Sequence, residues 1–266
     1  KGIDGWRLDV ARDVPLGFWK DWNKHVKSIN PDAILIGELW ELSDDFIGED
    51  GVFDALMNYN FAYAVNNYFI ADKRKIKTSE FVNQLKEIDR TYPEQTLHIL
   101  QNLLSSHDTD RLSSMIMNPD RNYDRDANEY NPNYNPAKPT DEAYKKQKQI
   151  AAFQLAYRGA PKIYYGDEVG MWGADDPHCR KPMVWDDLTF DNETFDHKSG
   201  FGKGFGTYTV KQNKELLEYY KKLINFRNSN EVLLYGDIDF TLIDDKNESF
   251  AFTRTFKDET VLSVFN

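Results

Sequence analysis

Short apolar runs alternate with longer amphipathic segments over the first 229 residues, and this alternation constrains the fold more than any other feature of the sequence. The run 33–37 is continuously apolar, as expected for a strand that is covered on both faces. Strands that alternate with helices pair in parallel, so the pattern predicts an α/β fold. The expected strands are 33–37, 53–57, 96–100 and 162–165, preceded by a strand and its exit over 5–10, and the expected helices are 15–29, 78–90, 143–157 and 214–227.

The pattern changes in three places. The stretch 118–141 is rich in Asn, Asp, Tyr and Pro, which predicts a long loop, and 166–206 is also irregular. After residue 229 four short apolar runs follow one another without helices, at 232–234, 240–243, 250–254 and 260–264, which is typical of an antiparallel sheet. The sequence therefore predicts one α/β domain over 1–229 and the start of an antiparallel β domain over 230–266.

Charge and hydropathy exclude two classes of partner. The chain carries 33 Lys and Arg against 44 Asp and Glu, a net charge of −11, so its surface repels the phosphates of a nucleic acid. No stretch approaches the roughly 20 apolar residues that a membrane span requires. The single cysteine, Cys179, excludes an intrachain disulfide and a cysteine-based zinc site.

Both ends of the sequence resemble interior segments of a protein. Residues 1–6 contain neither an initiator methionine nor the features of a signal peptide, and 259–266 stop inside a strand-like alternation. We expect the chain to be part of a longer one, and the sequence predicts no localisation.

Three carboxylates follow predicted strands: Asp9, Glu38 and Asp108. In a parallel barrel the carboxyl ends of the strands share one face, where catalytic groups collect. Each carboxylate taken alone is equally compatible with capping the next helix or with a solvated position.

The neighbours of these carboxylates favour a catalytic interpretation. Arg7 lies two residues before Asp9, so both side chains point to the same side of a strand and the guanidinium can keep Asp9 ionised. Glu38 lies between apolar residues, a setting that favours its protonated form. One ionised and one protonated carboxyl group are what glycoside hydrolysis with retention requires. His107 pairs a further donor with Asp108.

Four motifs carry a resemblance to a known family. The segments GWRLDVA (5–11), GELW (37–40) and LLSSHDTDR (103–111) resemble the second, third and fourth conserved regions of the α-amylase family of glycoside hydrolases, family 13. Together with GADDPHCRKPMVW (173–185), they are most similar to the neopullulanase, cyclomaltodextrinase and maltogenic amylase subgroup. The resemblance covers nearly the whole chain. It implies the C-terminal part of a (β/α)8 TIM barrel, about strands 4 to 8, followed by the beginning of an antiparallel β-sandwich domain.

The resemblance also implies a function and a role for each matching residue. The function is hydrolysis of α-1,4 and also α-1,6 glucosidic bonds in cyclomaltodextrins, pullulan or starch oligosaccharides through a covalent intermediate. Asp9 would be the nucleophile, Glu38 the general acid and base, and Asp108 the transition-state stabiliser. The implied substrate-binding residues are Arg7, His107, Asp176 and Arg180, while Trp40, Tyr59 and Trp172 are candidates for stacking on sugar rings or for packing.

The sequence departs from the family in one large respect. The first conserved region of the family and the first three barrel strands would precede Lys1. The resemblance makes calcium a candidate cofactor, although the family's usual calcium site draws on that preceding part. It also implies either a homodimer or an N-terminal part of the barrel that completes this one. The alternatives are a non-catalytic relative that binds sugar or a partner, and an inactive fragment of the enzyme.

Overall fold

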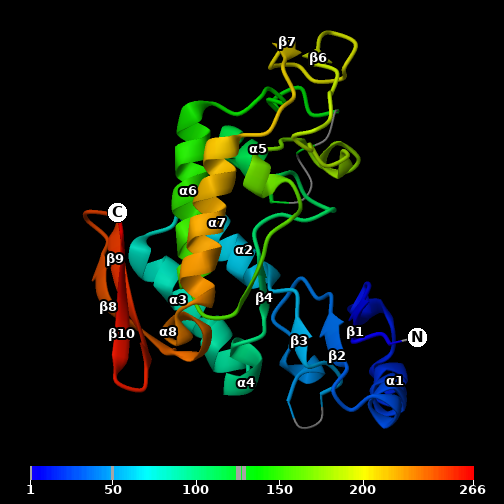
Figure 1. The fold of residues 1–266 in the computed structure, drawn as a ribbon, viewed down its shortest axis with the longest axis vertical. Helices are drawn as coiled ribbons and strands as arrows, with labels where there is room; N and C mark the ends of the chain where they lie inside the picture. The colour runs from blue at the N-terminus through cyan, green and yellow to red at the C-terminus, as the bar shows by residue number, and fades with distance from the viewer. Residues whose placement is uncertain (1, 49–50, 124–126, 128–129) are drawn as a thin grey trace.

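The computed structural model describes residues 2–48, 51–123, 127 and 130–266, and its centre is a row of parallel strands. Strands β1 (Gly5–Leu8), β2 (Ile34–Gly37) and β3 (Ala55–Leu56) pair in parallel in chain order. Strands β4 (Gln101–Leu103) and β5 (Ala160–Lys162) form a second parallel pair, which a parallel bridge between Met57 and Gln101 joins to β3. The five strands therefore run in the order β1 to β5, as Figure 1 shows from right to left for β1 to β4.

Helices follow these strands, as the sequence predicts. The first, α1, begins after Pro15 and buries Trp19, whose indole nitrogen donates to the carbonyl oxygen of Ala11 at 2.8 Å. Helix α2 continues directly into a π-helical turn, η3, and both are buried. The helices are α1 (Leu16–Ile29), α2 (Tyr59–Val65), η3 (Asn66–Ile70), α3 (Thr78–Thr91), α4 (Glu94–Leu97), α5 (Leu112–Met117), α6 (Asp141–Ala156), α7 (Lys214–Asn228) and α8 (Glu231–Tyr235), with short 3-10 turns η1 (Ala11–Asp13), η2 (Asp44–Phe46), η4 (Asp167–Val169) and η5 (His178–Arg180).

Three strand predictions are wrong in type or position. The run 96–100 belongs to α4 and the turn after it, and β4 begins only at Gln101. The run 232–234 lies in α8, where an acidic residue in the first turn favours a helix. The predicted strand 162–165 is shifted, because β5 ends at Lys162. Apolar runs of three to five residues cannot distinguish a strand from a short buried helix. Helix α5 ends at Met117, directly before the expected loop 118–141. Residues 124–126 and 128–129 of that loop lie outside the described residues.

The antiparallel sheet predicted after residue 229 is confirmed. Strands β8 (Asp237–Asp244), β9 (Ser249–Phe256) and β10 (Glu259–Phe265) form it, with β9 in the middle. A small hairpin of β6 (Glu193–Phe195) and β7 (Gly206–Tyr208) stands at the other end of the molecule (Figure 1).

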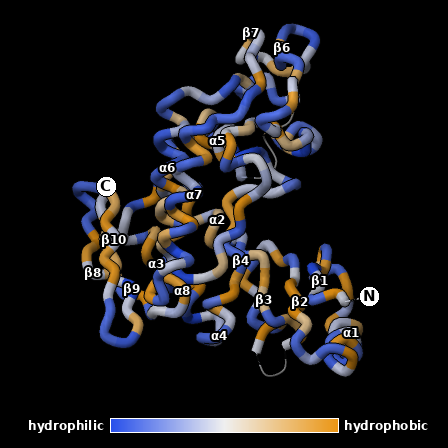
Figure 2. The backbone as a smooth tube through the Cα atoms, in the orientation of Figure 1, coloured by the Kyte–Doolittle hydropathy of each residue, from blue (hydrophilic) through white to orange (hydrophobic). Residues whose placement is uncertain are grey.

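Aromatic side chains join the antiparallel sheet to the helices. Phe250 and Phe252 of β9 are fully buried and pack against Phe153 of α6, with ring centroids 5.7 and 6.1 Å away. Phe81 of α3 contacts the same group. Hydrophobic stretches along β2, β3 and the antiparallel strands are visible in Figure 2. One continuous core therefore supports both sheets. Among the described residues, no helix combines the length and apolar character needed to cross a bilayer.

Candidate active site

The ends of β1 and β2 bring the first two predicted carboxylates together. The strands pair in register, Arg7 opposite Ile36 and Leu8 opposite Gly37, so their carboxyl ends lie level. The ladder continues one step further, because the Glu38 amide donates to the carbonyl oxygen of Leu8 at 3.0 Å. Asp9 and Glu38 therefore emerge at the same edge of the sheet.

One guanidinium connects these two carboxylates. Nη1 of Arg7 donates to Oδ1 of Asp9, and Nη2 forms an ion pair of 2.7 Å with Oε1 of Glu38. Nε of Arg7 points to the Met57 sulfur at 3.4 Å, beyond the end of β3. The predicted contact between Arg7 and Asp9 is present. The expectation of purely apolar surroundings for Glu38 is wrong, because its carboxylate shares the same cation.

Glu38 is the more tightly held of the two carboxylates. Its side chain is 6% exposed, whereas that of Asp9 is 71% exposed. The amide of Val10 donates to Oε2 of Glu38 at 3.0 Å, and the Tyr59 hydroxyl donates to Oε1 at 3.4 Å. Val10 has a φ of 44°, a left-handed conformation that a β-branched residue rarely adopts and that costs on the order of 1–3 kcal/mol. In this backbone conformation the Val10 amide points toward Glu38. Nothing in the sequence predicted this conformation.

The third predicted carboxylate lies on the β4 side of the same cleft. Oδ1 of Asp108 accepts from Nη2 of Arg180 at 3.0 Å, and its Oδ2 lies 3.1 Å from Nε2 of His107. Nε of Arg180 lies 2.8 Å from the carbonyl oxygen of His107 and 2.9 Å from Oδ1 of Asp176. The thiol of Cys179 donates to that same carbonyl, and burial raises the pKa of this thiol to about 12, so it stays a neutral donor. Arg180 thus connects loop 173–181 to the end of β4.

A cleft of about 640 Å³ joins the two groups. The predicted residues that line it are Asp9, Glu38, Trp40, His107, Asp108 and Arg180. Arg7 contacts two of these lining residues, Asp9 and Glu38, and Asp176 contacts a third, Arg180. Sequence reasoning missed Arg12 and Glu41, which also line the cleft and whose charges alone did not distinguish them from solvated residues.

Trp40 and Tyr59 have different positions from those expected of two sugar-stacking rings. They stack on each other, with centroids 3.9 Å apart and an interplanar angle of 12°. Tyr59 is fully buried and Trp40 covers one face of its ring, so no face of Tyr59 is open to a sugar. Burial raises the pKa of Tyr59, which keeps its hydroxyl a donor toward Glu38. Tyr59 supports Trp40 and Glu38, and only Trp40 faces the cleft.

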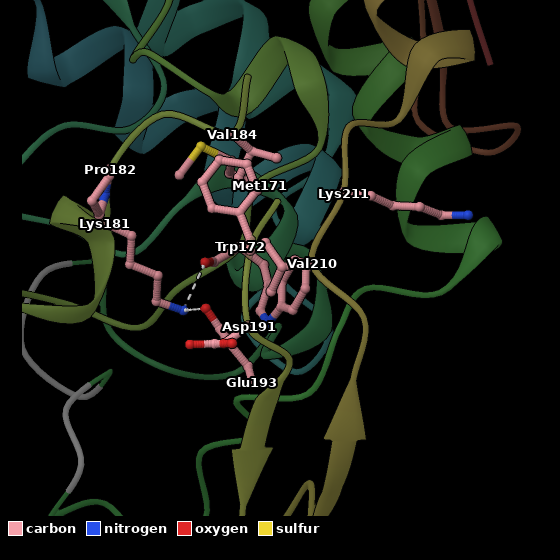
Figure 3. A pocket seen from close by; sticks show the side chains of 10 residues that line it. Met171, Trp172, Lys181, Pro182, Val184, Asp191, Glu193, Val210 and Lys211 are labelled. Atoms are coloured by element: carbon pink, nitrogen blue, oxygen red, sulfur yellow. Dashed lines mark hydrogen bonds and ion pairs between the residues drawn. The ribbon is translucent and has the colours of Figure 1, made fainter. Parts of the chain in front are cut away.

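Trp172 lines a different cavity, about 230 Å³ in volume (Figure 3). Its side chain is buried, and the ammonium groups of Lys138 and Lys181 lie 5.6 and 5.7 Å from the ring centroid. Lys181 also forms an ion pair of 2.5 Å with Glu193, drawn as a dashed line in Figure 3. This position favours the packing interpretation of Trp172.

A buried ionic unit underlies the His107–Asp108 segment. Oδ2 of Asp167 accepts from the Ser105 hydroxyl, and its Oδ1 lies 3.3 Å from Nη1 of the fully buried Arg111. The Arg111 amide donates to the carbonyl oxygen of Gly173 at 3.0 Å, which ties the segment to the next loop. Burial raises the pKa of Asp167 to about 6, against the opposing effect of Arg111. This unit positions the segment and does not reach the cleft.

The donors present do not fit a calcium site. Within the described ranges, no three His, Cys, Asp or Glu side chains are arranged to hold a metal ion. Calcium binds through six to eight oxygen ligands, usually several of them carboxylates. We therefore derive no step through a metal.

Comparisons with known proteins identify the family of the chain. The family model described as "Alpha amylase, catalytic domain" matches residues 1–236. A cyclomaltodextrinase from Geobacillus thermopakistaniensis is 35% identical over 99% of this chain, and neopullulanase 2 from Thermoactinomyces vulgaris is 35% identical over all of it. The chain spans 37% of the length of each of these relatives.

Solved structures show the same similarity. A cyclomaltodextrinase structure superimposes on the whole chain with a TM-score of 0.74 and 34% identity, and the match covers 37% of that structure. The cyclic α-maltosyl-(1→6)-maltose hydrolase of Arthrobacter globiformis, solved in complex with its cyclic sugar, matches 99% of this chain and 48% of its own with a TM-score of 0.74 and 25% identity. The chain belongs to the α-amylase catalytic domain family, whose fold is a TIM barrel.

Proposed function

We propose that this chain carries the catalytic centre of a retaining α-glucan hydrolase. The observation that carries the proposal is the Arg7 guanidinium between Asp9 and Glu38, at the level ends of two adjacent parallel strands. Retention requires two carboxyl groups about 5 Å apart, and a shared guanidinium holds them side by side. Asp108 lies across the same cleft.

Asp9 is the nucleophile of the first step. Its exposed side chain faces the cleft, and the contact from Arg7 to Oδ1 orients the carboxylate for attack. A carboxylate oxygen of Asp9 forms a bond to the anomeric carbon while the bond from that carbon to the glycosidic oxygen breaks. Glu38 donates its proton to the departing oxygen, so the leaving sugar departs as a neutral alcohol.

Water completes the reaction in the second step. Glu38, now ionised, takes a proton from the water molecule whose oxygen attacks the anomeric carbon, and the bond to Asp9 breaks. Two inversions give overall retention. The contacts from the Val10 amide and the Tyr59 hydroxyl keep Glu38 in place for both proton transfers.

Recognition of the sugar falls to the β4 side of the cleft. Asp108 accepts hydrogen bonds from hydroxyl groups of the sugar in the cleavage subsite, and His107 donates a hydrogen bond to the same sugar. Arg180 and Asp176 bind the next sugar on the non-reducing side. From the β2 side of the cleft, Trp40 offers a ring face. Each of these side chains lines the cleft or contacts a residue that does.

The relatives support the choice of α-glucans as substrates. Their names include cyclomaltodextrinase, neopullulanase and maltogenic α-amylase. We propose α-1,4 bonds in cyclomaltodextrins, pullulan or starch oligosaccharides as the main target and α-1,6 bonds as a second. We further propose that 1–229 belong to the catalytic barrel, about strands 4 to 8, and that 230–266 begin the next domain. The partner that completes the barrel is then an N-terminal part of the protein, with a homodimer as the alternative.

The test is to offer the natural full-length protein cyclomaltodextrin, pullulan and starch in separate reactions and to identify the products. Release of maltose or panose supports the proposal. The competing function is a sugar-binding relative without chemistry, and binding of a glucan by the folded protein with no product from any of the three would favour it.

A further inference from the structure

The long loop between α5 and α6 is anchored to the segment that carries Asp108. This loop spans 118–140, and residues 118–123, 127 and 130–140 of it are described. Its anchor is Asp110, whose fully buried carboxylate lies two residues after Asp108. Oδ2 of Asp110 accepts from Nε of Arg121 at 2.7 Å and from the Tyr134 hydroxyl at 3.0 Å. Two loop side chains therefore converge on one buried group, which fixes the loop beside the β4 side of the cleft.

Tyr123 extends this loop to the β2 side of the cleft. Its buried ring packs edge-on against both rings of the aromatic stack, Trp40 and Tyr59, with centroids 6.4 and 6.5 Å away and interplanar angles of 74° and 86°. Its hydroxyl donates to the carbonyl oxygen of Leu104, directly after β4, at 2.9 Å. Burial raises the pKa of Tyr123 well above its ordinary value, so this hydroxyl stays a neutral donor. One side chain thus connects the aromatic stack to the β4 segment.

The aromatic stack in turn contacts Glu38. Trp40 follows Glu38 by two residues, and the Tyr59 hydroxyl donates to Oε1 of Glu38 at 3.4 Å. The two rings of the stack are in contact, with centroids 3.9 Å apart, so a shift of either ring moves the other. A hydroxyl usually lies within about 3.0 Å of its acceptor, so the contact with Glu38 is long and a small further displacement of the ring breaks it.

We infer that Tyr123 is a positioning residue for Glu38 and that it acts through the aromatic stack. The inference rests on the proposed function. Among the described residues that line the cleft, Tyr123 has no place, so its effect on the reaction passes through Trp40 and Tyr59. Because loop 118–140 holds Tyr123 against the β4 segment, the same ring relates the position of the general acid to that of the sugar-binding side.

Loss of the Tyr123 ring should impair proton donation and spare the nucleophile. Misplacing a reacting group by about 1 Å costs up to about 10²-fold in rate. The contact between Arg7 and Asp9 involves neither ring of the aromatic stack, so the nucleophile keeps its orientation. Fluoride departs from α-maltosyl fluoride without a proton, whereas the leaving sugar of maltotetraose needs one from Glu38. The two substrates therefore distinguish a misplaced acid from a general loss of structure.

We would prepare Tyr123→Leu and Tyr123→Phe in the natural full-length protein and measure kcat/KM on both substrates. The readout is kcat/KM on the fluoride divided by kcat/KM on maltotetraose. This ratio does not depend on the fraction of protein that is folded, so a merely structural loss leaves it unchanged. Tyr68→Leu is the matched control, since Tyr68 is also buried and its hydroxyl also donates to a backbone carbonyl, that of Glu248 beside the antiparallel sheet, at 2.7 Å.

Tyr123→Leu should raise the ratio about tenfold, because only the maltotetraose constant depends on the position of the acid. Tyr123→Phe keeps the ring and should keep the ratio within about twofold of the unaltered protein, as should Tyr68→Leu. An unchanged ratio in Tyr123→Leu would overturn the inference, and so would an equal rise in Tyr68→Leu. Should Tyr123→Leu not fold, Tyr123→Met takes its place under the same criterion. Inactivity of the unaltered protein on both substrates would instead contradict the proposed function, and the inference with it.

Discussion

The two sides of the cleft are built differently. On the β1–β2 side, Glu38 is buried and held by a cation, a backbone amide and a phenol. On the β4 side, Arg180 connects Asp108 and Asp176 through ion pairs whose members are all one-third to one-half exposed. The two groups assigned to bond breaking are thus held at strand ends by one guanidinium, with Glu38 buried, whereas those assigned to sugar binding are partly exposed and held by the ion pairs of Arg180. Substitutions on the first side should therefore affect turnover, and those on the second should affect binding.

Asp9→Asn should have the largest effect. Without a carboxylate nucleophile the covalent intermediate cannot form, so we expect kcat on a glucan to fall by about 10⁴-fold or more. Steady-state rates on cyclomaltodextrin measure this loss. Asp21→Asn, a change of an exposed carboxylate on α1, is the control and should leave the rate unaltered. Comparable rates for Asp9→Asn and Asp21→Asn would remove Asp9 from the mechanism.

Glu38→Gln should come next and should depend on the leaving group. Loss of the general acid lowers the rate on a glucan by about 10²–10⁴-fold, but fluoride departs without needing a proton. The variant should therefore cleave α-maltosyl fluoride far faster than maltotetraose, and its covalent intermediate should be trapped on Asp9 and detected by mass spectrometry.

The pH profile offers a check on the same pair. With Asp9 ionised and Glu38 protonated, kcat/KM of the unaltered protein on a glucan should be bell-shaped, and Glu38→Gln should lose the alkaline limb. An alkaline limb that survives in the variant would assign the acid to another residue.

Arg180→Gln tests the other side of the cleft. It should raise KM for maltotetraose about tenfold and change kcat much less, because we propose that Arg180 contacts the bound sugar and only indirectly the reacting atoms. Its exposed ion pairs contribute about 0–1 kcal/mol to stability, so the melting temperature should hardly change. A large fall in kcat with unaltered KM would erase the contrast between the two sides.

Asp167→Asn should have the smallest effect on activity, visible mainly in stability. Burial raises the pKa of Asp167 to about 6 in the folded chain, above the ordinary value of 3.8. The protonated form therefore stabilises the fold fully below about pH 4, and this contribution is lost as pH rises to about 6, with an upper limit of about 3 kcal/mol. The fall in melting temperature between pH 4 and 6 should be larger in the unaltered protein than in the variant, since Asp110, whose pKa burial raises to about 7, contributes to it in both. Superimposable curves would show that Asp167 is already ionised throughout.

The sequence predicted the parallel pattern, the antiparallel sheet and the strand-end positions of Asp9 and Glu38, because hydrophobic periodicity and motif spacing carry that information. Asp108 lies five residues after the end of β4, because the strand predicted before it is misplaced. The sequence misplaced the segments 96–100 and 232–234, where short apolar runs fit a helix and a strand equally well. At the site, it anticipated the contact of Arg7 with Asp9 but not that with Glu38, since a strand pattern relates neighbours along one strand only. The strained Val10 amide and the burial of Tyr59 depend on tertiary packing, for which local sequence gives no signal.

The most direct test of the central claim is the anomeric form of the first product. Time-resolved NMR of the natural full-length protein with cyclomaltodextrin would record the newly formed reducing end before mutarotation. Because the Arg7 guanidinium contacts both Asp9 and Glu38, we expect the α anomer to form first. We expect no product from Asp9→Asn. A β anomer as the first product would contradict the account, because it would mean that water attacks directly and that Asp9 is not a nucleophile.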